Sequence, residues 1–131
     1  MQLRLFVYFV LFSLAPGLLY QFVQDELRPG GAAINPTADY VFGVAPNALG
    51  ALSASAALFL MVLGLDKAAR LRRAFLVSLT LGLFGLFAWE AAQLVLPGFT
   101  FDPHDLAATA IGSTFFAAAT LLSFPEILRG R

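Results

Sequence analysis

Residues 74–96 read AFLVSLTLGLFGLFAWEAAQLVL, an apolar run in which Glu90 is the single charged residue. A helix needs about 20 apolar residues to cross the hydrocarbon core of a bilayer, so this run predicts a membrane-spanning helix. A charged side chain at the bilayer centre costs about 2.5–3.5 kcal/mol on insertion scales, and ionisable residues inside a membrane are therefore functional candidates. Glu90 is the first such candidate in this sequence.

The composition extends this prediction to the whole chain. Of its 131 residues, 60% are hydrophobic and 12% are charged, whereas soluble domains carry about 25% charged residues. Apolar runs long enough to span a membrane lie at about residues 5–23, 47–65, 74–96 and 106–124. We therefore expect an all-α fold, a single membrane domain over residues 1–131 built as a four-transmembrane-helix bundle.

The basic residues predict how the bundle is oriented. Arg28 stands alone on one side of the predicted spans, and the other seven stand on the opposite side: Arg4, Lys67, Arg70, Arg72, Arg73, Arg129 and Arg131. Because cytoplasmic loops carry an excess of Lys and Arg, both termini are expected to be cytoplasmic. A basic start before an apolar run also fits an export signal, but residues 5–23 exceed a typical signal core and no A-x-A pattern follows, which favours a retained helix.

Two further features concern the first half of the chain. Pro16-Gly17 interrupts the first run and predicts a kink there. Residues 24–45 are polar and rich in turn residues, which predicts a loop before the second span. The second span carries small residues four apart, such as Gly50 with Ala54 and Ser53 with Ala57, and this spacing predicts close helix packing.

The third span places its polar groups on one side. At about 100° per residue, seven residues fall within an arc of roughly 140°: Ser78, Gly82, Gly85, Leu86, Trp89, Glu90 and Gln93. A polar face is costly in lipid, so we expect it to point into the bundle. Counting back from Pro97 puts Glu90 about 10 Å below the outer end of its helix, in the outer leaflet.

A matching face recurs on the fourth span, at Asp105, Thr109, Gly112, Ser113, Phe116 and Thr120. The short connection at 97–101 predicts an antiparallel hairpin in which the two polar faces can meet. Asp102 before Pro103 also has the pattern of a helix start, and capping alone accounts for both Asp102 and Asp105.

Little in the sequence favours catalysis. The chain has no cysteine, and its lone histidine, His104, is expected at an exposed loop edge, so no metal or cofactor is predicted. No residues have the spacing of a nucleophile with its base. The formal net charge is zero, which argues against nucleic acid as a partner. An enzyme is therefore the least supported class.

The motif Glu90-x-x-Gln93, a short loop, Asp102-x-x-Asp105 and Gly112 resembles that of the VanZ-like family, small four-helix membrane proteins named for a teicoplanin-resistance protein. The family pattern has an arginine before the first aspartate and an asparagine four residues after the second. This chain has Thr100 or Phe101 in the first place and Thr109 in the second. The resemblance implies a multi-pass protein of the bacterial cytoplasmic (inner) membrane with a role in the cell envelope.

The leading hypothesis is an outer-leaflet acidic pocket, formed by Glu90, Gln93, Asp102 and Asp105 with Thr109 nearby, that recognises a lipid-linked or cell-wall component. Membrane lipid is then the expected partner. A single protonatable carboxyl in a bundle is also typical of a small proton-coupled transporter. The many small residues equally suit a structural or accessory membrane subunit.

Overall fold

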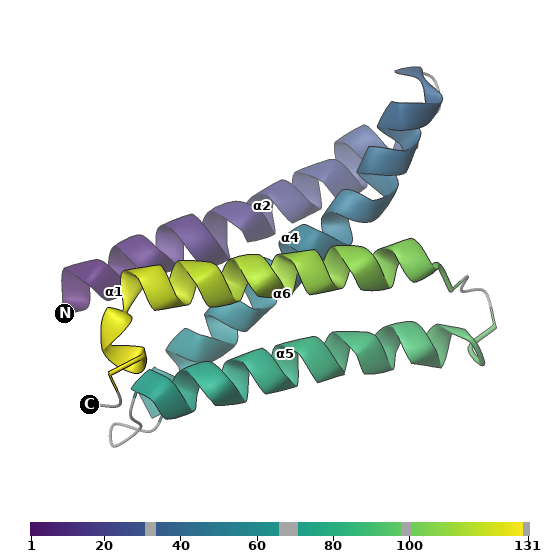
Figure 1. Ribbon diagram of the computed structural model, residues 1–131. Coiled ribbons are helices and arrows are strands. Elements are labelled where there is room, and N and C mark those ends of the chain that lie inside the picture. Colours follow the sequence, from purple (N-terminus) through teal and green to yellow (C-terminus); the bar gives the residue numbers. More distant parts are fainter. Residues whose placement is uncertain (31–33, 66–70, 98–100, 130–131) are drawn as a thin grey trace.

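The computed structural model describes residues 1–30, 34–65, 71–97 and 101–129. Within these ranges every regular element is helical, and four helical runs are long and apolar enough to cross a membrane. They are Gln2–Gly30, Pro36–Leu65, Leu71–Gln93 and Pro103–Ser123. The predicted all-α architecture, with four helical runs able to cross a membrane, is confirmed for the described residues (Figure 1).

The first span, Gln2–Gly30, changes its hydrogen-bond register along its length. It runs through α1 (Gln2–Tyr8), the π-helix η1 (Phe9–Leu14), α2 (Ala15–Phe22), the π-helix η2 (Val23–Leu27) and the 3₁₀ turn η3 (Arg28–Gly30). At the end of η1 the backbone N–H of Ala15 bonds to the carbonyl of Val10, five residues earlier. Pro16 follows directly, and a proline ring crowds the preceding turn of a helix. The irregularity expected at Pro16-Gly17 is thus a widened π turn through which the helix continues.

The second span, α4 (Pro36–Leu65), begins well before residue 47, so the prediction of a loop over 24–45 is wrong. Asn35 acts as its cap, since its side-chain oxygen accepts a hydrogen bond of 2.8 Å from the backbone N–H of Ala38. Pro36 takes the first helical position, where its fixed φ and missing N–H cost nothing. Pro46 lies buried inside the helix. Asparagine and proline often end helices, but at Asn35-Pro36 they start one.

α4 is the central helix of the bundle. It packs against the first span, α5 (Leu71–Gln93) and α6 (Pro103–Ser123), and Figure 1 shows it passing obliquely behind α6. Gly112 of α6 lies against the Ala48 backbone so closely that a Cβ would not fit, and Gly82 of α5 lies in the same way against the Ser55 side chain. Small residues at these crossings let the backbones approach.

The first and the last described residues of the chain lie at one end of the bundle, which we call the terminal end (Figure 1). There the hydroxyls of Tyr8 and Thr120 are 2.6 Å apart and share a hydrogen bond, and Tyr8 packs edge-on against Phe124. Arg4 donates a 2.8 Å hydrogen bond to Glu126, and its guanidinium lies 4.6 Å from the centre of the Phe124 ring. We call these five residues the terminal clasp, because they join the first turns of the chain to the last.

The described basic residues divide between the two ends as the sequence predicts. Arg4, Arg72, Arg73 and Arg129 lie at the terminal end, and Arg28 lies at the other (Figure 1). Lys67, Arg70 and Arg131 lie outside the described residues.

Candidate functional site

Glu90 lies in the last turn of α5 and is only 4% exposed. Its carboxyl oxygen accepts a 2.8 Å hydrogen bond from the side-chain amide of Gln93, three residues later on the same helix. Residues three positions apart in the sequence lie on the same face of a helix, and the two side chains therefore meet. The buried carboxyl of Glu90 is therefore paired with an amide of its own helix.

The buried face of α6 is wider than the buried face of α5. On α6 the predicted face is buried at Thr109, Gly112, Ser113, Phe116 and Thr120, which confirms it. On α5, Ser78, Gly82 and Glu90 are buried, but Gly85 and Trp89 are exposed. The arc predicted for α5 is too wide because this helix meets its neighbours along a narrow strip, and the rest of its surface faces outward.

Asp102 starts α6 as its N-cap. Its carboxylate accepts hydrogen bonds from the backbone N–H of His104 at 2.9 Å and pairs with the His104 ring at 2.8 Å. These two bonds, the backbone one first, hold the pKa of Asp102 below its usual value, so the side chain stays ionised at neutral pH. His104 is exposed, as predicted, and its ring stands edge-on to Tyr40 of α4 with centroids 5.5 Å apart.

Asp105, in the first turn of α6, is hydrogen-bonded to the Asn47 side chain of α4. Asp105 and Asp102 both lie close enough to Glu90 for their charges to act on it. Thr109 follows one turn below Asp105 and is 2% exposed. The fold thus gathers the three predicted carboxyl groups at the end of the bundle opposite the terminal end.

A cavity of about 330 Å³ opens at this end. Its lining comes from three elements of the chain and comprises Arg28, Asp39, Tyr40, Gly43, Val44, Asp102 and Asp105. We call it the acidic pocket. Of the predicted residues, Asp102 and Asp105 line it, whereas Glu90, Gln93 and Thr109 are not among its described lining residues.

Arg28, Asp39 and Tyr40 were not among the candidates that the sequence suggested. They were assigned to a loop, and only their place at the end of the first span and the start of α4 brings them to the pocket. The Asn35-Pro36 cap is the signal that predicts an early start of α4 and, with it, a helical position for Tyr40.

The acidic pocket carries charges of both signs. Three carboxylates and one guanidinium line it, and the Arg28 side chain donates a 3.1 Å hydrogen bond to Gln24, four residues earlier on the first span. A volume of about 330 Å³ falls within the range of roughly 300–1,000 Å³ that is usual for small-molecule sites. The arrangement suits a ligand that bears an amine together with an anionic group.

No protein-family model, curated protein or solved structure matches this chain. The likeness to the VanZ-like family accordingly rests on the residues from Glu90 to Gly112, and the function has to be argued from the chemistry of the site.

Proposed function

We propose that this chain is a VanZ-like integral membrane protein of the bacterial inner membrane that recognises a lipid-linked or cell-wall component in its acidic pocket. In this proposal both termini are cytoplasmic, so the pocket opens on the outer side, where the cell wall is assembled. The cellular consequence is an envelope role of the teicoplanin-resistance type.

The observation that supports the proposal is the acidic pocket itself. In a chain with 12% charged residues, three carboxylates and a guanidinium from three separate elements surround one cavity. Helix capping explains Asp102, and the hydrogen bond to Asn47 gives Asp105 a structural role. Neither effect explains why Arg28 shares an open cavity with them. Charged groups kept near a membrane around a hollow are typical of ligand sites.

The test is a resistance assay in a teicoplanin-sensitive Gram-positive host. We expect the wild-type chain to raise the minimum inhibitory concentration of teicoplanin and the double variant Asp39→Asn/Asp102→Asn to lose this effect at equal protein level in the membrane. Glu26→Gln is the matched control, because it removes one charge near the same end but does not line the pocket. A wild-type chain that leaves the inhibitory concentration unchanged contradicts the proposal.

A small proton-coupled transporter is the second candidate, and buried hydroxyl groups favour it. Ser55 and Ser113 are buried, and their oxygens have no hydrogen-bond partner among the described residues. Such groups are usually satisfied by internal water, and water inside a bundle is what a proton path requires. Proteoliposomes with an internal pH-sensitive dye test this function. Proton uptake that disappears in Glu90→Gln supports the transporter, and no uptake by the wild type excludes it.

A further inference from the structure

The acidic pocket is formed by the same three elements of the chain as a second hollow. It is formed by Arg28 of the first span, by α4, and by Asp102 and Asp105 of α6. A second hollow of about 440 Å³ is formed by the same three elements, through Phe12 of the first span, Leu52 of α4 and a row of α6 residues. Both hollows therefore lie where the first span and α6 each pack against α4.

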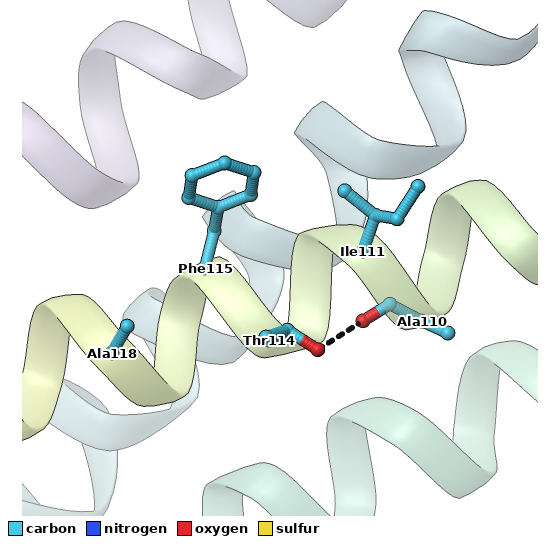
Figure 2. Close-up of a pocket in the computed structure, with 5 residues that line it drawn as sticks. All are labelled: Ala110, Ile111, Thr114, Phe115 and Ala118. Carbon is cyan, nitrogen blue, oxygen red and sulfur yellow. Dashed lines mark hydrogen bonds between the residues drawn. The ribbon is translucent and has the colours of Figure 1, made fainter.

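The second hollow is apolar, and a third hollow adjoins it along α6. Its α6 residues are Phe115, Ala118, Ala119, Leu122 and Ser123, and a third hollow of about 320 Å³ shares Phe115 and Ala118 with it. Figure 2 shows the third hollow, where the one hydroxyl group, on Thr114, donates a 2.8 Å hydrogen bond to the Ala110 carbonyl of its own helix. We call the two hollows together the apolar groove.

The groove has the length of a lipid chain. From Ala110 to Leu122 the helix rises about 18 Å at 1.5 Å per residue, which exceeds half of a hydrocarbon core about 30 Å thick. Its upper end begins five residues, or about 7.5 Å, below Asp105. Measured along the helix axis, the groove therefore begins within the reach of an acyl chain whose head group is in the acidic pocket.

The charges of the pocket restrict the head group. A guanidinium such as that of Arg28 presents several donors in a planar fork and suits a phosphate. The carboxylates of Asp39 and Asp102 can accept hydrogen bonds from an ammonium group, and the aromatic ring of Tyr40, which also lines the pocket, is a residue type that attracts cations. With three carboxylates against one guanidinium, a head group that is only anionic meets net repulsion.

We propose that the acidic pocket and the apolar groove together bind one phospholipid whose head group carries a primary amine, with the phosphate at Arg28, the ammonium group at Asp39 and Asp102, and an acyl chain in the apolar groove. The inference rests on the proposed function and deepens it, because it names the chemical class of the ligand that the acidic pocket takes.

Native mass spectrometry of the full chain in detergent tests this binding. Phosphatidylethanolamine, phosphatidylcholine and phosphatidylglycerol with identical acyl chains are added in competition. We expect phosphatidylethanolamine to be retained in preference to the other two, Asp39→Asn and Asp39→Asn/Asp102→Asn to abolish the preference, and Glu26→Gln to keep it. Asp39 is exposed, so its single variant reports on binding even where the double variant fails to fold.

A second pair of variants tests the groove. Ala118→Phe fills it and should lower the retention of all three lipids, whereas Ala57→Phe, at an exposed position of α4 outside the groove, should not. Equal binding of the three lipids with no effect of the aspartate variants overturns the amine preference and leaves the proposed envelope function intact. A clear preference for phosphatidylethanolamine without any teicoplanin phenotype supports the lipid site and contradicts the proposed envelope function. Unchanged binding in Ala118→Phe overturns the placement of the chain.

Discussion

Glu90 combines burial with a single described hydrogen bond, from Gln93, and two substitutions separate its possible roles. Glu90→Gln keeps the shape and a polar group but removes the acid. Glu90→Ala leaves Gln93 without its partner, at a cost of about 1–3 kcal/mol. We expect Glu90→Gln to accumulate normally and Glu90→Ala to lower the amount of folded protein, and the level of protein in the membrane measures both effects. Because Glu90 does not line the acidic pocket, a loss of activity in Glu90→Gln is expected in the proton-uptake assay if the chain is a transporter.

Normal accumulation and full activity of both Glu90 variants would contradict a central role for this residue. Gln93→Leu is a useful companion, because it removes the donor and keeps the acid. If Glu90 acts through its own titration, Gln93→Leu should retain part of the activity that Glu90→Gln loses.

Single residues were predictable where the signal is local. The capping of α6 by Asp102 and the buried face of α6 follow from spacing along one helix, and the structure bears out both. Arg28 and Tyr40 could not be predicted as site residues in this way. Their place in the acidic pocket depends on how the first span, α4 and α6 meet, and no local pattern encodes that meeting.

At the scale of helices, the crossing of α4 and α6 depends on Gly112. An added Cβ would collide with the Ala48 backbone, which cannot move aside as a flexible side chain can. We expect Gly112→Ala to destabilise the folded protein by about 1–3 kcal/mol, the usual cost of overpacking. Thermal unfolding in detergent measures this loss.

Gly85→Ala is the matched control for Gly112→Ala. A Cβ at Gly85 meets nothing within 4 Å, and alanine is favoured over glycine inside a helix by about 1 kcal/mol. Gly85→Ala should therefore leave stability unchanged or raise it. Equal destabilisation by the two changes would show that close approach at Gly112 is not what makes glycine necessary there.

Element type was easier to predict than element ends. Apolar runs of the required length identified all four spans, because length and hydropathy are properties of one segment. The ends of the first span and the start of α4 were missed. Proline and asparagine end helices in some settings, and at Asn35-Pro36 they begin one. Which outcome holds depends on the residues that follow.

For the molecule as a whole, the proposed orientation predicts that both termini and the segment between α4 and α5 are cytoplasmic. Reporter fusions after residues 65 and 131 should then show cytoplasmic activity, and a fusion after residue 97 should show the external pattern. Because the acidic pocket lies opposite the terminal end, an external reporter signal at residue 131 would place the pocket in the cytoplasm and contradict a role at the cell wall.

The terminal clasp gives the whole bundle a pH dependence. Hydrogen bonds from its own backbone N–H and from Arg4 lower the pKa of Glu126 in the folded protein. A lowered folded-state pKa means that the clasp stabilises the protein above the unfolded value and that this contribution disappears as the pH falls through the folded value. We expect the unfolding temperature in detergent to drop as the pH falls below the usual carboxyl range, and to drop less in Glu126→Gln.

The size of this pH effect is limited by exposure, since Arg4 and Glu126 are each 39% exposed and water screens their attraction. High salt should weaken it further. An acid response that is identical in wild type and Glu126→Gln would show that other carboxyl groups control the low-pH stability.

The terminal clasp also constrains the order of events during synthesis. Tyr8 and Thr120 are 112 positions apart, and Arg4 and Glu126 are 122 apart. The first helix therefore leaves the ribosome and enters the membrane long before its partners exist, and its polar side chains must be shielded meanwhile by water or by the insertion machinery. A chain cut after Ser123 retains four complete spans but lacks Phe124 and Glu126. Pulse-chase labelling should show that it inserts as well as the full chain and is then removed faster by membrane proteases.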